Sequence, residues 1–235
     1  MENTYSVKVP ATFKIKHIPI MNELENAGMV TSIKCISILT GLPLKKVVDF
    51  KVNDIIDIYR EICLSAAKVK VLKKLPNEVE ILGQTYVLVN PIKQPVSWVI
   101  DSSELVKDDN PEMLAAFMYI EKGTTYGETD SNQNIINSVF PRAAIFKEEM
   151  SINLYLALVY KYAEVVKEIN IIVGNKEKKS EEGTGHSTPF AWENLILQVG
   201  KEFNMDFHDV MKLNIKTFMH YTKVLFHNLK EKMKA

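Results

Sequence analysis

Hydrophobic residues recur with helical spacing along most of this chain. In the clearest stretch, from Ile152 to Ile172, apolar side chains fall at intervals of three and four residues, which is typical of a helix with a wide buried face. Asn110 followed by Pro111 is a strong helix start, and Gly41 ends a helix that Thr31 can cap. The pattern therefore predicts a mainly helical chain with the Ile152–Ile172 helix at its centre.

Shorter apolar stripes predict the remaining helices. Before the centre they run from Ile18 to Leu24, from Pro43 to Phe50, from Asn53 or Asp54 to Cys63, from Val96 to Asp101 and from Glu112 to Glu121. Near the C-terminus they run from Thr188–Pro189 to Val199, from Met205 to Leu213 and from Ile215 to Met233. In the stripe that ends at Cys63, Ile55 and Ile56 both count as positions of the buried face.

Two segments alternate with the period of a strand. From Glu78 to Val89, two alternating runs flank Gly83-Gln84, and glycine supplies the positive φ of a tight hairpin turn. From Tyr5 to Lys16 the alternation is interrupted by Pro10, which favours an extended pair or an edge strand. The predicted fold class is thus α+β and predominantly helical, with one or two small β-hairpins.

One polar segment divides the chain. Residues 174–187 carry no large apolar side chain, so they cannot bury enough surface to offset the entropy of ordering and are expected to form a flexible linker. The prediction is a helical body with the hairpin over residues 1–173 and a small C-terminal three-helix unit over residues 188–235. That unit is small for independent stability, so it is expected to dock on another surface.

A weak internal repeat relates residues 42–62 to residues 205–225. With a shift of 163 residues, Gly41 meets Asn204 and the apolar positions coincide. The matched apolar pairs are Leu42 with Met205, Leu44 with Phe207, Val47 with Val210, Phe50 with Leu213, Val52 with Ile215, Ile55 with Phe218 and Ile62 with Leu225. Either two amphipathic hairpins fall into register by chance, or two related helical modules offer two related docking faces.

Charge and composition narrow the class of partner. The chain has 235 residues, of which 29 are basic and 29 acidic, and this balance makes nucleic acid an unlikely partner because phosphate binding needs a basic face. No apolar run approaches the roughly 18 residues of a membrane span. The first residues lack the basic and apolar regions of a secretory leader, and the two cysteines form no CxxC pair. A cytoplasmic protein with reduced thiols is expected.

The search for catalytic and metal-binding motifs finds none. The five histidines are not spaced as metal ligands, and no nucleophile elbow or phosphate-binding glycine loop is present. The sequence therefore predicts a protein that is not an enzyme and has no cofactor, no metal and no catalytic residue. An enzyme, the alternative, would require a pocket lined by several of five side chains, namely Glu121, Glu128, Asp130, His208 and His220.

The most distinctive stretch, Met118 to Asp130, places aromatic and acidic side chains close together at a helix end and in a polar loop. A solvated loop after a helix cap at Gly123 explains it. A loop that contacts a partner also explains it, because tyrosine is a common binding anchor. The six candidate partner-binding residues are Tyr119, Glu121, Tyr126, Trp98, Trp192 and Phe218.

Four segments carry a resemblance to a known family. They are Ile36–Val48, Ile81–Val89, Trp98–Asp101 and Ala115–Tyr126, in an order that resembles the tail assembly chaperones and related small tail or baseplate proteins of tailed bacteriophages. The resemblance spans most of residues 1–173 and, more loosely, 188–235. It rests on layout and scattered residues, and the family has no catalytic residues to transfer.

The resemblance implies a non-enzymatic protein of the host cytoplasm. Such a protein binds a tail component, such as the tape-measure or hub protein, and prevents its premature assembly. The alternative it leaves open is a structural subunit of the virion, in the tail, the baseplate or a ring, where a homo-oligomer is expected.

Overall fold

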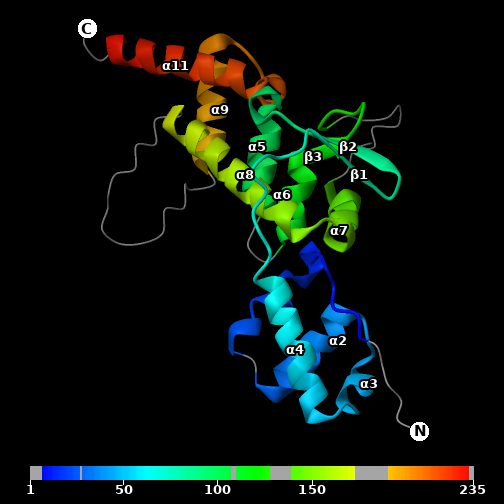
Figure 1. Cartoon of the computed structure of the whole chain (residues 1–235). Coiled ribbons are helices and arrows are strands. Elements are labelled where there is room, and N and C mark those ends of the chain that lie inside the picture. Colours follow the sequence, from blue (N-terminus) through cyan, green and yellow to red (C-terminus); the bar gives the residue numbers. More distant parts are fainter. Residues whose placement is uncertain (1–6, 27, 107–109, 128–138, 173–189, 233–235) are drawn as a thin grey trace. The chain divides into compact units, whose positions relative to one another are not determined.

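The protein is predominantly helical, with one small antiparallel sheet (Figure 1). The computed structural model describes residues 7–26, 28–106, 110–127, 139–172 and 190–232. This confirms the α+β class predicted from the hydrophobic pattern. The expected linker at residues 174–187 lies outside the described residues.

The chain forms two compact units. The N-terminal unit comprises residues 1–75 and 141–158, and the C-terminal unit comprises residues 76–140 and 159–235. The long helix expected at Ile152–Ile172 has those bounds, and its residues are divided between the two units. The three helices after residue 188 belong to the same unit as the hairpin, so the small module expected there packs within a larger unit.

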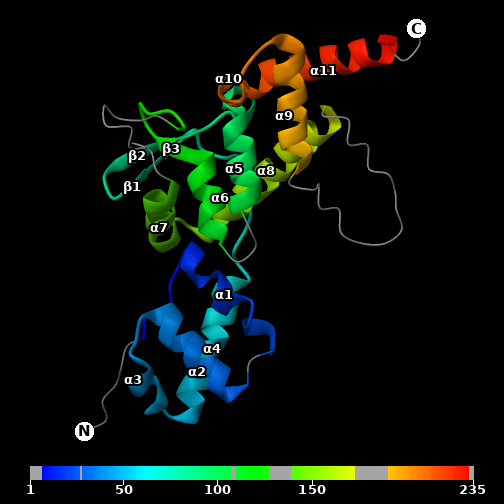
Figure 2. The same ribbon diagram turned by 180° about the vertical axis from the view of Figure 1, so that it is seen from behind.

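The N-terminal unit is built from short helices around one core. Its elements are η1 (Ile15–His17), α1 (Ile18–Met21), η2 (Leu24–Asn26), α2 (Met29–Thr40), α3 (Leu44–Val48), α4 (Val52–Ala66), α7 (Val139–Glu149) from residue 141, and the start of α8 (Ile152–Ile172). Fully buried aliphatic side chains at Ile36, Val47 and Ile62 join α2, α3 and α4. Figures 1 and 2 show α2, α3 and α4 gathered in this unit.

The C-terminal unit combines the sheet with two groups of helices. Its elements are β1 (Glu78–Ile81), β2 (Gln84–Leu88), η3 (Pro91–Lys93), α5 (Val96–Leu105), α6 (Pro111–Met118), β3 (Tyr119–Glu121), the rest of α8, α9 (Phe190–Phe203), α10 (Phe207–Lys212) and α11 (Ile215–Lys232). One cluster of buried side chains unites Val96 of α5 with Ile196, Val210 and Phe218 of the last three helices.

The sheet has the order β1-β2-β3, with both pairs antiparallel. Ile81 pairs with Gln84, so the hairpin turn is Leu82-Gly83, one residue earlier than the Gly83-Gln84 turn predicted. Both turn residues have positive φ, 53° and 77°, as a two-residue turn between twisted strands requires.

Three local predictions are wrong, and in the first of them a longer-range contact decides the structure. The helix predicted to run to Glu121 ends at Met118, because Tyr119–Glu121 pairs with β2 as β3. The segment predicted as an edge strand forms only an isolated bridge from Lys14 to Ser151 within its described residues. The helix α2 begins at Met29 after Gly28, and Thr31 lies inside it.

The internal repeat is present in the structure. The N-terminal module, α2 to α4, and the C-terminal module, α9 to α11, have the same order of helices. The second helix starts at Leu44 in one and Phe207 in the other, and the third at Val52 and Ile215, an offset of 163 in both cases (207 minus 44, and 215 minus 52). At the end of the first helix the same offset relates two left-handed residues, Gly41 with φ 72° and Asn204 with φ 53°.

The backbone hydrogen bonds at the starts and ends of these helices also repeat. Val47 N donates to Pro43 O at 3.3 Å, and Val210 N donates to Asp206 O at 3.1 Å. The remaining pairs are Phe50 N to Val47 O at 3.2 Å with Leu213 N to Val210 O at 3.1 Å, and Ile55 N to Lys51 O at 3.1 Å with Phe218 N to Asn214 O at 3.0 Å. The two modules therefore share the order of their helices, the lengths of their turns and the hydrogen bonds at their helix ends, all at the offset of 163 residues.

One polar detail follows the repeat as well. Ser37 Oγ in the N-terminal module donates to Leu42 O at 2.7 Å. Its counterpart, Gly200, lies so near the counterpart carbonyl that an added Cβ would be 2.8 Å from Met205 O. In both modules this position lies against the carbonyl of the second residue after the first helix, and in the C-terminal module the close approach favours glycine.

Candidate protein-binding surface

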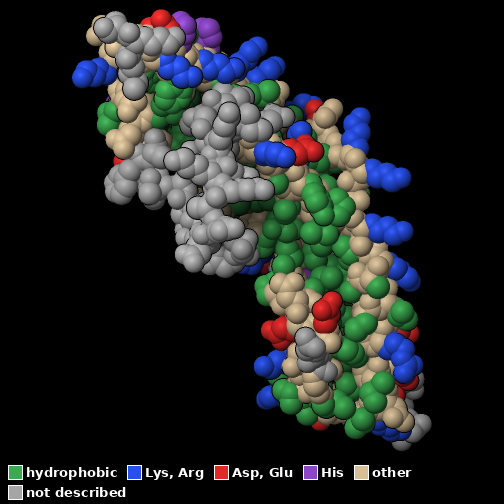
Figure 3. All heavy atoms as spheres, turned by 90° about the vertical axis from the view of Figure 1, so that its left-hand side faces the viewer, with side chains coloured by type: hydrophobic (Ala, Val, Ile, Leu, Met, Phe, Trp, Pro, Cys, Tyr) green, Lys and Arg blue, Asp and Glu red, His purple; other side chains and the backbone are tan. Residues whose placement is uncertain are grey.

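Exposed aliphatic side chains follow α3 and α4 of the N-terminal unit. Val48 is 58% exposed, Val52 is 57% exposed and Ile56 is 44% exposed. We call these three residues the α3–α4 face. Val52 and Ile56 are four residues apart, so they lie on one side of α4. Figure 3 shows hydrophobic side chains among basic and acidic ones at the surface of this unit, in its lower part.

A pocket adjoins the α3–α4 face at Ile56. Its volume is about 330 Å³, and its exposed lining is almost entirely apolar. The lining residues come from the first and third helices of the module, and they are Met29, Ser32, Ile55, Ile56, Tyr59 and Arg60. Because Met29 is itself 44% exposed, apolar side chains surround the pocket on the α2 side as well. A pocket of this kind accepts an apolar side chain.

Two titratable groups of this unit, Tyr59 and Cys35, are held in neutral forms. Tyr59 Oη donates to Leu24 O at 2.5 Å, and burial, with Cys63 nearby, raises the pKa of Tyr59 to about 12. Burial, followed by the carboxylate of Glu23, raises the pKa of the Cys35 thiol. A protonated thiol is a poor nucleophile, so this environment suits packing better than reaction.

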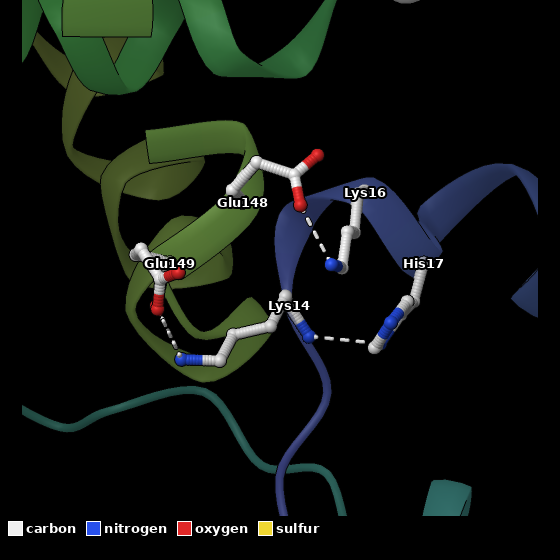
Figure 4. Close-up of polar contacts among 5 residues, drawn as sticks. All are labelled: Lys14, Lys16, His17, Glu148 and Glu149. Carbon is white, nitrogen blue, oxygen red and sulfur yellow. Dashed lines mark hydrogen bonds and ion pairs between the residues drawn. The ribbon is translucent and has the colours of Figure 1, made fainter. Parts of the chain in front are cut away.

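A polar clamp ties the start of the N-terminal unit to its later helices (Figure 4). Lys16 Nζ lies 2.6 Å from a carboxylate oxygen of Glu148, and Lys14 Nζ lies 3.5 Å from one of Glu149. Lys14 Nζ also donates to Glu149 O at 2.6 Å, and Lys14 N donates to Nδ1 of His17 at 3.1 Å. The last bond requires an unprotonated Nδ1 on a buried imidazole.

Acidification is expected to destabilise the N-terminal unit through this clamp. Burial, followed by Lys16, lowers the pKa of His17 below 6.5, so the unfolded chain binds more protons than the folded one. Stability is therefore complete above about pH 6.5 and falls as pH decreases below it. The hydrogen bond from Lys16 lowers the pKa of Glu148 below 4.5, which adds a smaller loss at lower pH because that carboxylate is exposed.

The measurement is the urea midpoint at pH 7.5 and at pH 5.5 for the native chain and for His17→Asn. Asparagine keeps an oxygen acceptor near the position of Nδ1 but does not titrate, so the variant is expected to lose less stability between the two pH values. An equal loss in both proteins contradicts the assignment to His17.

Three of the six side chains predicted to contact a partner are in the core. Trp98 and Tyr119 are 0% exposed and Phe218 is 1% exposed. Trp98 Nε1 donates to Phe117 O at 3.2 Å, and Tyr119 Oη donates to Pro76 O at 2.6 Å. Their polar atoms are satisfied inside the C-terminal unit, so packing explains these aromatic residues and they are not part of an accessible surface.

The other three predicted residues are partly exposed. Tyr126 contacts the ring of Phe117 and donates from its hydroxyl to the carboxylate of Asp101. Trp192 stacks on Phe218 with ring centroids 6.0 Å apart. Glu121 lies in β3 at the edge of the sheet. These contacts give Tyr126 and Trp192 a structural role within the C-terminal unit.

Among the described residues, no group of three or more histidine, cysteine or acidic side chains is placed to hold a metal ion. Of the five residues considered for an enzyme, Glu128 and Asp130 lie outside the described residues, and His208 and His220 are exposed on α10 and α11. Within the same described part of the chain, every helix is too short or too polar to cross a membrane.

Comparisons with protein-family models, with curated protein sequences and with solved structures find no match to this chain. The candidate surface therefore rests on the geometry of the N-terminal unit.

The α3–α4 face was not among the surfaces predicted from the sequence. Ile56 was predicted to belong to the buried stripe, because an apolar residue beside Ile55 fits a helix face that packs inward. The structure buries Ile55, which is 4% exposed, and leaves Ile56 at the surface. The available signal was the width of the stripe: Ile55 and Ile56 are adjacent, so they point about 100° apart around a helix.

Proposed function

We propose that this protein is a non-enzymatic protein-binding factor that acts as a chaperone of phage tail assembly. The observation that carries the binding function is the α3–α4 face, whose three aliphatic side chains stay at the surface beside an apolar pocket. An exposed apolar group of this kind is stabilised by covering it, and such groups commonly mark protein-protein contacts.

The resemblance of the sequence to tail assembly chaperones supports the identity of the partner. On that basis the partner is a tail component, such as the tape-measure or hub protein, bound in the host cytoplasm before the tail is complete. An aggregation-prone partner exposes apolar segments before assembly, which matches the apolar chemistry of the α3–α4 face.

The test is recovery of a partner from cells that produce the phage, with the tagged native chain, Ile56→Glu and Ile38→Glu. Ile38 is 50% exposed on α2 and lies about half a turn around that helix from Met29, so it is a matched control away from the pocket. Both substitutions are at the surface, where effects on stability stay near 0.5 kcal/mol.

A tail protein is expected to copurify with the native chain and with Ile38→Glu. The amount recovered with Ile56→Glu is expected to be at least about tenfold lower, because a carboxylate at the contact must be desolvated. Recovery of no phage protein contradicts the chaperone function. Stoichiometric presence of the chain in purified particles assigns it instead to the virion as a structural subunit.

A further inference from the structure

Basic side chains follow the outer side of α11 at regular spacing. Lysine recurs at every seventh residue, and a histidine lies four residues after each of the first two lysines. The five side chains are exposed, and they are Lys216, His220, Lys223, His227 and Lys230. Because intervals of three and four residues keep side chains on one side of a helix, they form a continuous row about 21 Å long. We call these five residues the α11 basic row.

The α11 basic row faces away from the core of its unit. On the other side of α11, Ile215, Phe218 and Leu225 are at most 3% exposed. Lys232, which lies outside the row, is 3.6 Å from a carboxylate oxygen of Glu202. Among the residues that the structure describes, none of the row's three lysines forms an ion pair. Figure 3 shows histidine and lysine side chains close together at the top of the view, where α11 lies.

The corresponding helix of the N-terminal module carries the opposite charge. On α4, which has the place of α11 in that module, exposed carboxylates lie at Asp54, Asp57 and Glu61. Their intervals are also three and four residues, so they share one side of α4. Asp57 lies 3.4 Å from Arg60, but both side chains are 68% exposed, so water screens this pair. We call the three carboxylates the α4 acidic row.

The two rows match in spacing when the helices run in opposite directions. From Asp54 onwards the acids follow at intervals of three and four residues, and from Lys230 backwards the bases do the same. Every α-helix rises about 1.5 Å per residue, so the three levels coincide along the two axes. In the parallel direction the same intervals bring only one lysine and two histidines opposite the acids. The antiparallel pairs are Asp54 with Lys230, Asp57 with His227 and Glu61 with Lys223.

An exposed apolar side chain borders each row. Leu64 is 58% exposed and follows Glu61 by three residues, and Phe226 is 38% exposed and follows Lys223 by three residues. Each is therefore turned about 60° from its charged neighbour in the same direction, so antiparallel helices bring both to one side of the contact. A second register with matching intervals begins at Lys223, but it moves Phe226 beyond the end of the acidic row. Burial of these side chains adds an apolar contribution that exposed ion pairs do not supply.

We propose that α11 of one copy of this protein binds α4 of a second copy, in antiparallel orientation, through the α11 basic row and the α4 acidic row. A second copy carries the acidic row with the matching intervals, and its helix has the same rise per residue. The chain has 29 basic and 29 acidic residues, so its charge balance provides no general attraction for a nucleic acid. The partner of the basic row is therefore another molecule of the same protein.

This contact joins two different surfaces, so each copy can bind one neighbour through α11 and another through α4. Head-to-tail contacts of this kind give a ring when the rotation between copies closes and a filament when it does not. The inference goes beyond the proposed function, because the α3–α4 face takes no part in the contact. Around α4, Ile56 lies about 160° from Asp54 and about 140° from Glu61.

The test is sedimentation of the full-length chain over a range of concentrations and salt. The native chain is expected to associate at concentrations up to about 0.5 mM, because exposed ion pairs make weak contacts. Association is expected to be present in about 0.05 M salt and largely lost in about 1 M salt, where the Debye length is about 3 Å.

Charge reversal of each row separates this contact from other modes of association. Lys223→Glu/Lys230→Glu alone and Asp54→Lys/Glu61→Lys alone are each expected to associate at least tenfold more weakly than the native chain. An equimolar mixture of the two variants is expected to restore association, because each reversed row then meets a row of opposite charge. Lys45→Glu/Lys46→Glu is the matched control, since both lysines are exposed on α3 and the change in charge equals that of the first variant.

A native chain that stays monomeric over this range overturns the inference, as does a mixture that associates no better than either variant alone. Binding of a labelled oligonucleotide by a monomeric chain, abolished by Lys223→Glu/Lys230→Glu, assigns the basic row to nucleic acid instead. Ile56→Glu is expected to associate like the native chain even where it fails to recover a tail protein. The two proposals can therefore fail separately, and association that Ile56→Glu abolishes overturns this one.

Discussion

Replacing Trp98 with alanine is expected to lower the free energy of unfolding by about 3 to 5 kcal/mol. The indole is fully buried, contacts Phe117 edge-on with ring centroids 6.1 Å apart and approaches Tyr162 at 6.4 Å. Its removal leaves a cavity among α5, α6 and α8 and deprives Phe117 O of its hydrogen bond from Nε1. The measurement is the free energy of unfolding from urea denaturation.

Trp192→Ala is the matched control, because Trp192 is partly exposed and contacts Phe218 through one ring face. A loss below about 2 kcal/mol is expected there. These are the only two tryptophans in the chain, so Trp192→Phe leaves Trp98 as a single fluorescent reporter of the C-terminal unit. A loss for Trp98→Ala no larger than for Trp192→Ala contradicts the buried position.

Truncation of equivalent core residues is expected to lower the free energy of unfolding substantially in both modules. Phe218→Ala should cost about 3 to 5 kcal/mol and Ile55→Ala about 2 to 5 kcal/mol. Phe218 is 1% exposed and Ile55 is 4% exposed, and each lies between the three helices of its own module. Because the positions correspond, each truncation removes the same central contact from a different unit of the chain.

The repeat also supplies the control for this pair. Leu44 and Phe207 correspond to each other, begin the second helix of each module and are 48% and 40% exposed. Their replacement by alanine is expected to cost less than about 1 kcal/mol. Hydrogen exchange separates the two units, since Ile55→Ala should accelerate exchange in α2 to α4 and Phe218→Ala in α9 to α11. A central truncation that costs no more than its exposed counterpart contradicts the duplicated architecture.

These variants also separate two explanations for the aromatic residues. Trp98 and Phe218 were among the residues predicted to contact a partner, and large aromatic side chains are frequent binding anchors. The same property makes them frequent core residues, and the sequence contains no information on which of the two applies when a helix has apolar residues on several sides. A stability loss in the isolated protein favours the core role, whereas a loss restricted to partner binding favours the contact role.

The sequence by itself determined the elements whose signals are local. The start of α6 at Pro111, the end of α2 at Gly41, the bounds of α8 and the order of the three C-terminal helices all follow from caps, proline, glycine and apolar spacing. The 163-residue register of the repeat was also visible, because the turns between its helices have the same length and the same stop positions. Such features depend on hydrogen bonds and φ angles within a few residues.

Only the tertiary structure decided which apolar residues are covered. Tyr119–Glu121 forms a strand because β2 offers a free edge, although the local pattern continues a helix. Ile215 is buried and its backbone N–H donates to Gln94 O, before α5, whereas Val52, at the same place in the other module, stays exposed. A helix pattern specifies which residues share a side of the helix, but the free energy of burial depends on segments far away in the chain. For that reason the helices of the module could be predicted from the sequence, whereas the exposure of its α3–α4 face could not.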